Sequence, residues 1–150
     1  MGGECMSLIR RRLMLASQSN EPQFQPFPVS PWTLSSTING EGRDIINDRA
    51  AKFGAFCPTY YPAKTGDQIL RTKQNIDGDG TTLNLIVHEY KTAQGQLGWL
   101  RRTFSLYGNP ITLGQDTKYV RFTFAYPSTT GKTMTQEIID QYFAVSYRGE

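Results

Sequence analysis

The sequence predicts an all-β fold in the form of a β-sandwich or a β-barrel. Short runs rich in β-branched and aromatic residues follow one another from Trp32 onward, and such runs favour strands. Turn-forming sequences with glycine, proline, asparagine or aspartate separate these runs, and no long helical period interrupts them. The 150 residues of the chain suffice for one domain with a hydrophobic core.

The first part of the chain has a different pattern. Residues 1–17 are predicted to be a leader, with a helix over residues 7–17 whose N-cap is Ser7. The apolar side of this helix consists of Leu8, Ile9, Leu13 and Leu15. A helix of about eleven residues is marginal on its own in water, so we expect these side chains to mediate attachment or oligomerisation. Residues 18–31 contain four prolines, which indicate an extended spacer before a β-domain at residues 32–150.

The β-domain is expected to contain a series of short strands. The main strands are predicted at residues 32–38, 53–61, 67–73, 82–91, 96–104, 117–125 and 137–147. A weaker strand is expected near residues 110–113, and residues 134–141 also fit a short helical turn before the last strand. Alternation along the strands predicts a core face. Its members are Leu85, Val87, Val120, Phe122 and Phe124.

Residues 82–91 and 96–104 are predicted to form a hairpin. The expected pairs are Lys91–Gln96, Tyr90–Leu97, His88–Trp99 and Ile86–Arg101. This register leaves Leu100 and Phe104 on the core side of the sheet. It also puts Arg102 on the core side, so a bulge or a shifted register is the alternative.

In that register four side chains share the sheet face that points away from the core. They are His88, Tyr90, Trp99 and Arg101. Sugar rings stack on tryptophan and tyrosine, while arginine donates hydrogen bonds to hydroxyl or phosphate oxygens. This face is therefore a candidate glycan-binding surface. The alternative is a structural role, in which the face packs under a loop or against a neighbouring subunit.

Charge and hydropathy argue against nucleic-acid and membrane partners. The net charge is only +3, and Arg10, Arg11 and Arg12 supply most of the excess. The β-domain is thus not expected to carry a basic face for nucleic acid. No apolar run approaches the ~18 residues that a membrane-spanning helix needs. The two cysteines, Cys5 and Cys57, are expected to be separate thiols.

The sequence motifs predict neither an enzyme nor a cofactor. Residues 128–133 resemble the end of a phosphate-binding loop, but Tyr126 stands where that loop needs glycine. Asp77 and Asp79 lie in a glycine-rich tight turn that lacks the further acids of a calcium loop, which leaves ion binding there open. His88 is the only histidine, which excludes a multi-histidine zinc site.

Four segments resemble small structural proteins from phages and prophages of gut Firmicutes. They are SLIRRRLM at residues 7–14, YYPAKTGDQI at 60–69, LIVHEY at 85–90 and TKYVRFTF at 117–124. The resemblance implies a jelly-roll-like sandwich of the carbohydrate-binding-module kind, carried on a virion as a tail, fibre or head-fibre component. His88 departs from the tyrosine that is usual at its position in that family.

From this resemblance we expect a non-enzymatic structural role and a location on the virion. The leader is expected to attach the protein to other virion proteins and to support a homo-oligomer, with a trimer as the working hypothesis. The β-domain is expected to face outward and to bind a glycan of the host surface. The alternatives are a bacterial glycan-binding surface module and an accessory domain of a cell-wall hydrolase.

Overall fold

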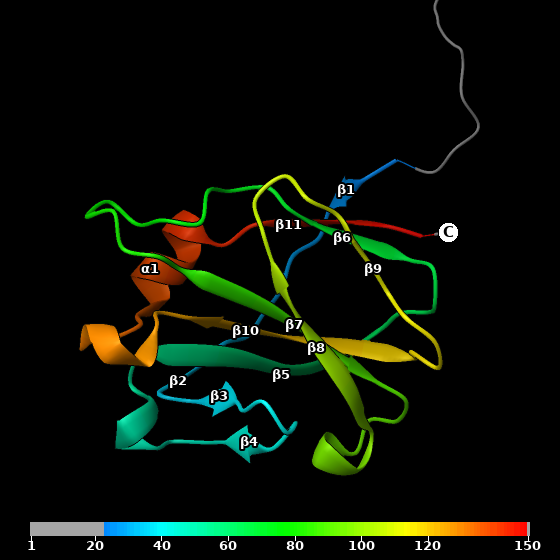
Figure 1. The fold of residues 1–150 in the computed structure, drawn as a ribbon, viewed down its shortest axis with the longest axis horizontal. Coiled ribbons are helices and arrows are strands. Elements are labelled where there is room, and N and C mark those ends of the chain that lie inside the picture. The colour runs from blue at the N-terminus through cyan, green and yellow to red at the C-terminus, as the bar shows by residue number, and fades with distance from the viewer. Residues whose placement is uncertain (1–22, 150) are drawn as a thin grey trace, which may run out of the picture.

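Two antiparallel sheets pack face to face in the computed structural model, which describes residues 23–149 (Figure 1). The four-stranded sheet has the order β1 (Gln25–Pro26), β11 (Val145–Arg148), β6 (Gln68–Arg71) and β9 (Ile111–Thr112). The five-stranded sheet has the order β2 (Thr33–Leu34), β5 (Gly54–Pro62), β10 (Tyr119–Ala125), β7 (Asn84–Tyr90) and β8 (Trp99–Ser105). The predicted class is thereby confirmed at the level of a mostly-β chain with packed antiparallel sheets. The leader residues Leu8, Ile9, Leu13 and Leu15 lie outside the described part of the chain.

The hydrophobic core lies between the two sheets, as the alternation of the strands predicts. Val120, Phe122 and Phe124 of β10 and Leu85 and Val87 of β7 are all fully buried in one cluster. Their neighbours on the same strands point to the opposite face of the sheet. That opposite face is called the outer face below. The four-stranded sheet closes the core with Ile69 and Val145.

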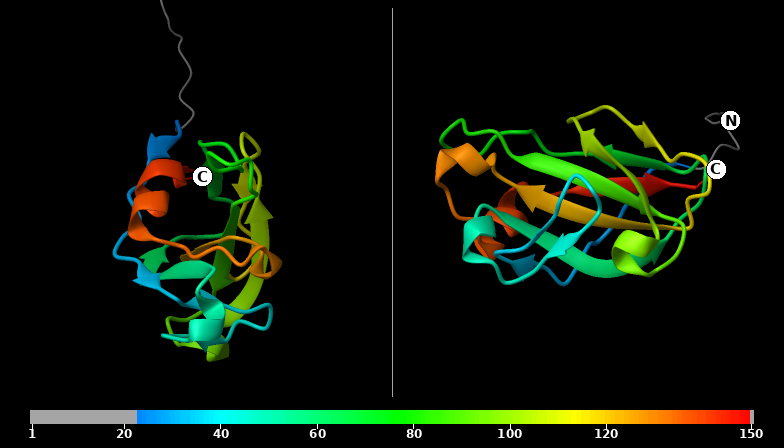
Figure 2. Two further views of the ribbon diagram at one scale, coloured as in Figure 1. Left: turned by 90° about the vertical axis from the view of Figure 1, so that its left-hand side faces the viewer. Right: turned by 60° about the horizontal axis from the view of Figure 1, so that its bottom comes forward.

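A small third sheet covers part of the outer face. It consists of β3 (Thr37–Ile38) and β4 (Asp44–Ile45), which pair antiparallel. Ser35 has a positive φ of 53°, and the turn there divides the predicted strand 32–38 into β2 and β3. The right-hand view of Figure 2 shows this β3–β4 hairpin, residues 37–45, in front of the five-stranded sheet.

The predicted strand at residues 137–147 is wrong in its first half. The helix α1 (Gln136–Tyr142) occupies this segment, and only then does β11 begin. The Thr135 side chain caps the helix by accepting a hydrogen bond from the Ile138 N–H at 3.2 Å. Ile139 is buried against the core. The alternative prediction of a helical turn at residues 134–141 is confirmed.

The spacer prediction is also corrected, because residues from Gln25 onward belong to the sandwich. β1 pairs with β11, and the Phe27 N–H donates to the Val145 carbonyl at 3.0 Å. Val29 is buried in the core, and the Phe27 ring stacks on Tyr147 with ring centroids 5.3 Å apart. The prolines keep the segment extended as predicted, but the apolar residues between them face the core. A proline on an edge strand costs no ladder hydrogen bond when its nitrogen faces outward.

The register of the hairpin between β7 and β8 differs from the prediction. Tyr90 lies opposite Trp99 and His88 opposite Arg102, with an irregularity between Glu89 and Tyr90. The turn contains a 3-10 helix at Gly95–Leu97 and closes with a hydrogen bond from the Lys91 N–H to the Gly98 carbonyl at 2.7 Å. The longer turn and the bulge together move Phe104 from the predicted core to the outer face, where it is 46% exposed.

The remaining short elements are the strand β9 and two further 3-10 turns. β9 confirms the weaker strand expected near residues 110–113. Further 3-10 turns occur at Arg49–Ala51 and Ser128–Thr130. Gly131 follows the second of these with a φ of 72°, a conformation that glycine adopts without steric cost. The segment at 128–133 is thus a turn, as predicted.

Candidate functional site

The structure buries most of the predicted aromatic cluster instead of exposing it. His88 and Tyr90 are fully buried on the outer face, beneath the β3–β4 hairpin. Trp99 is half-buried, and its indole lies against Gly42 so closely that a Cβ atom there would meet it at 2.3 Å. Gly42 has a φ of 83°, so this turn depends on glycine for both space and backbone conformation. The hairpin therefore closes over this surface, as expected from the alternative prediction in which the face packs under a loop.

His88 is held as a neutral imidazole by its neighbours. The Trp99 Nε1–H donates to His88 Nδ1 at 3.2 Å, so His88 Nε2 carries the proton and donates to Thr123 Oγ1 at 3.2 Å. Burial lowers the pKa of His88, and with the charges of Arg121 and Arg102 acting in the same direction it falls to about 3. Enclosed in this way, His88 positions Trp99 and has no access to a substrate proton.

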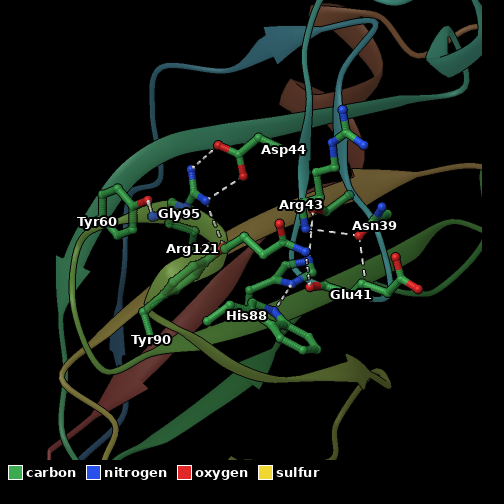
Figure 3. Close-up of polar contacts among 12 residues, drawn as sticks. Asn39, Glu41, Arg43, Asp44, Tyr60, His88, Tyr90, Gly95 and Arg121 are labelled. Atoms are coloured by element: carbon green, nitrogen blue, oxygen red, sulfur yellow. Dashed lines mark hydrogen bonds and ion pairs between the residues drawn. The ribbon is translucent and has the colours of Figure 1, made fainter.

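Tyr90 belongs to a second network, centred on Arg121 of β10 (Figure 3). Arg121 forms two hydrogen bonds with the Asp44 carboxylate, at 2.8 and 3.1 Å, and a third with the Tyr90 hydroxyl at 2.8 Å. The Tyr60 ring covers the guanidinium, with its centroid 4.3 Å from Arg121 Cζ. This network fastens the β3–β4 hairpin, through Asp44 of β4, to the sheet beneath it.

Arg101 is separate from the other three members of the predicted cluster. Its Nη1 donates to Glu89 Oε1 at 2.8 Å and to Thr117 Oγ1 at 3.1 Å, and its Nη2 donates to the Gln115 carbonyl at 2.8 Å. Glu89 is 1% exposed and also accepts from the Gly114 N–H at 2.8 Å. Arg101 is thus committed to fixing the loop before β10. The structure brings His88 and Trp99 together and places Tyr90 and Arg101 in two other networks.

The ammonium group of Lys132 lies between the carboxylates of Asp77 and Asp79. Lys132 Nζ lies 2.9 Å from Asp77 Oδ2 and 3.0 Å from Asp79 Oδ2, and the Tyr126 hydroxyl donates to Asp77 Oδ2 at 2.8 Å. Burial alone would raise the pKa of Asp77, but Lys132 and the hydrogen bonds from its neighbours lower that pKa well below its usual range. Over residues 23–149 no group of three or more histidine, cysteine or acidic side chains is placed to hold a metal ion.

The sandwich also carries an open groove that sequence reasoning missed. It has a volume of about 780 Å³ and runs between residues 26–32 and the α1–β11 segment. We call it the aromatic groove, and the residues of its lining that matter below are Phe27, Trp32, Gln136, Asp140 and Phe143. The signal in the sequence was the alternation of prolines with Phe27, Val29 and Trp32, which indicates a segment that packs on the sandwich.

The walls of the aromatic groove are fixed by hydrogen bonds and ring contacts. The Tyr61 hydroxyl donates to the Ser30 carbonyl at 3.0 Å and accepts from the Ser30 N–H at 2.9 Å. The Trp32 Nε1–H donates to the Val29 carbonyl at 3.0 Å. The Trp32 and Phe143 rings meet edge to face, with centroids 4.9 Å apart. The groove is therefore formed before any ligand arrives, which reduces the ordering cost of binding.

Polar groups of α1 line one side of these rings. Gln136 Nε2 donates to Asp140 Oδ1 at 2.8 Å. The side-chain oxygen Oε1 of Gln136 and Asp140 Oδ2 have no hydrogen-bond partner among residues 23–149, and both side chains are exposed. A carboxylate and an amide beside aromatic rings suit a ligand with hydroxyl groups on one side and an apolar face on the other.

Within the described residues, the helices are all too short and too polar to cross a membrane. No protein-family model, curated protein or solved structure matches this chain.

Proposed function

We propose that this chain is a virion structural protein, a tail, fibre or head-fibre component, whose β-sandwich binds glycans of the host surface in the aromatic groove. The resemblance of four sequence segments to phage structural proteins supports the location. The pairing of aromatic rings with an open carboxylate and amide in the groove carries the binding part of the proposal.

The order of the strands supports a jelly roll as the finer description of the fold. With the two-residue β2 set aside, the sheets are β1-β11-β6-β9 and β5-β10-β7-β8. From β5 onward the chain changes sheet at each step except between β7 and β8. This is the order expected of eight strands wound as two Greek keys, an architecture common among viral capsid and lectin domains.

Attachment through the N-terminal leader is part of the same proposal. Leu8, Ile9, Leu13 and Leu15 would pack against other virion proteins or against copies of themselves, with a homotrimer as the expected oligomer. Several copies on one particle would raise the avidity of a weak single site through effective concentration.

Glycan binding is tested with two variants of α1. Asp140→Ala removes the carboxylate of the groove, whereas Glu137→Ala removes an exposed carboxylate of the same helix that does not line the groove. Purified host-wall glycans should bind the intact protein and the Glu137→Ala variant, and should bind Asp140→Ala several-fold more weakly. The absence of binding by the intact protein, or equal binding by both variants, would remove the groove from this role.

The virion location is tested independently of binding. An antibody against the protein should label purified particles from a producing host, and deletion of residues 1–17 should abolish the labelling while the β-domain stays folded. Particles that contain none of the protein would refute the location without bearing on the groove.

A further inference from the structure

A second, smaller pocket lies on the outer face beside the β3–β4 hairpin. It has a volume of about 250 Å³. Its floor includes a row of side chains that are opposite one another in three strands: Phe104 of β8, Ile86 of β7 and Thr123 of β10. Asn39 of the hairpin and Ser128 of the turn after β10 also line it. This outer-face pocket shares no residue with the aromatic groove.

Phe104 gives the outer-face pocket an accessible aromatic surface. The ring is 46% exposed, whereas Ile86 beside it is 6% exposed. The β3–β4 hairpin covers the sheet at His88 and Arg121 but leaves Phe104 open. An accessible ring over an otherwise closed apolar floor offers contact area for the C–H face of a small ligand.

Arg102 gives the pocket a positive charge that has no carboxylate partner among residues 23–149. Arg101 and Arg121, on β8 and β10 of the same sheet, are both paired with carboxylates. The exposed side chain of Arg102 has no ion pair or hydrogen bond among residues 23–149, and its guanidinium carbon lies 5.1 Å from the centroid of the Phe104 ring. Gly40 leaves space for it, because a Cβ atom at that position would lie 3.0 Å from Arg102 Nη2. The guanidinium is therefore held at the pocket and free to bind an anion.

Neutral polar groups complete the lining. Thr123 accepts a hydrogen bond from His88 Nε2 and is 1% exposed, so it closes the floor of the pocket. The Asn84 amide and the Ser128 hydroxyl line the pocket without a side-chain hydrogen bond to any residue between 23 and 149. These groups suit hydroxyl oxygens and hydroxyl hydrogens alike.

We propose that the outer-face pocket binds one sugar ring that carries an acidic group, either a carboxylate or a phosphate. Arg102 pairs with the acidic group, Phe104 contacts the C–H face of the ring, and Asn84 and Ser128 bind its hydroxyls. The pocket is smaller than the roughly 300–1,000 Å³ typical of sites for drug-sized ligands, which fits a single ring. This site is independent of the glycan binding proposed for the aromatic groove.

The test is a titration of the isotope-labelled full-length protein, followed by NMR. The probes are glucuronate, glucose 6-phosphate and glucose, so that the carboxylate and the phosphate are compared with a neutral ring of the same shape. At least one acidic sugar should shift the amide signals of Asn84 and Phe104 and should bind about tenfold or more tightly than glucose. The probe that binds more tightly identifies the acidic group.

Two variants assign the binding to the pocket. Arg102→Gln should weaken the acidic sugar about tenfold and leave the weak glucose affinity unchanged, because only the charge is removed. Arg49→Gln removes the same charge from an exposed position outside the pocket and should bind as the unaltered protein does. The proposal is overturned if neither acidic sugar binds more tightly than glucose, or if Arg102→Gln and Arg49→Gln behave alike.

Discussion

Arg71 and Arg121 are both buried, but the protein surrounds them in opposite ways. Each side chain is almost completely inaccessible, with Arg71 1% and Arg121 2% exposed. Arg121 has a carboxylate partner in Asp44, a phenol in Tyr90 and the face of the Tyr60 ring. Arg71, at the end of β6, lies over the Phe124 ring at 5.6 Å from its centroid, and its hydrogen bonds within residues 23–149 all go to backbone carbonyls, of which that of Leu83 is nearest at 2.8 Å.

The two environments move the guanidinium pKa in opposite directions. Burial lowers the pKa of Arg71 to about 10, because no negative charge offsets the loss of water. Burial also acts to lower the pKa of Arg121, but the Asp44 carboxylate and Tyr90 outweigh it and raise that pKa. At Arg121 a charge pair ties a hairpin to a sheet. At Arg71 one guanidinium donates hydrogen bonds to backbone carbonyls of three separate segments. Its buried charge has no carboxylate partner among residues 23–149.

The largest effect is expected when the charge pair is broken. Arg121→Met should lower the free energy of unfolding by about 3–5 kcal/mol, because it leaves Asp44 and the Tyr90 hydroxyl without their partner under the hairpin. Urea unfolding at neutral pH measures this. The double variant Arg121→Met with Asp44→Asn should recover part of the loss, since no carboxylate is then left unpaired. Two losses that simply add would show that the two side chains do not interact.

A smaller effect is expected from acid, through His88 next to Arg121. The pKa of His88 is about 3 in the folded protein and its ordinary value is 6.5, so below pH 6.5 the unfolded chain binds a proton that the folded protein does not. Stability should therefore be full above pH 6.5 and fall as the pH decreases toward 3, by about 2 kcal/mol at pH 5. The charged groups that face the imidazole are Arg121 and Arg102, and both disfavour its protonation.

The control for the acid effect is the His88→Gln variant. His88 is the only histidine of the chain, so no other imidazole titrates between pH 5 and 6.5. Urea unfolding at pH 7 and pH 5 should show a smaller difference for His88→Gln than for the unaltered protein. An equal pH dependence in both proteins would show that His88 is not the group responsible.

The burial of the core face could be predicted from the sequence, whereas the burial of the outer face could not. Val120, Phe122 and Phe124 alternate with polar residues, and that period alone determines which face is buried. The outer face was mispredicted because its cover comes from residues 37–45, far away in sequence. A lone Asp44 on a two-residue strand carries no local signal that it will neutralise Arg121 of β10.

The candidate sites were missed for a related reason. The bulge between Glu89 and Tyr90 moves Arg102 and Phe104 to the outer face. Arg102 on the predicted core side indicated a bulge or a shifted register, but the alternating sequence does not show where a bulge of one residue lies. The aromatic groove depends on the contact between the rings of Trp32 and Phe143, which lie near opposite ends of the domain's sequence. Only the paired sheets bring these two rings together.

The smallest effect, and the sharpest contrast with Arg121, is expected at Arg71. Arg71→Met removes hydrogen bonds to the carbonyls of Leu83, Ser105 and Gln74, but it also removes a buried charge that has no counter-ion among residues 23–149. These contributions have opposite signs, so the net loss in the free energy of unfolding should be only about 1 kcal/mol.

Arg71→Lys should be more destabilising than Arg71→Met, although it is the conservative change. A lysine keeps the buried charge, but its single ammonium cannot reproduce the spread of guanidinium donors over three carbonyls. Urea unfolding of both variants decides the point, and a lysine variant more stable than the methionine variant would mean that the positive charge itself stabilises this end of the sandwich.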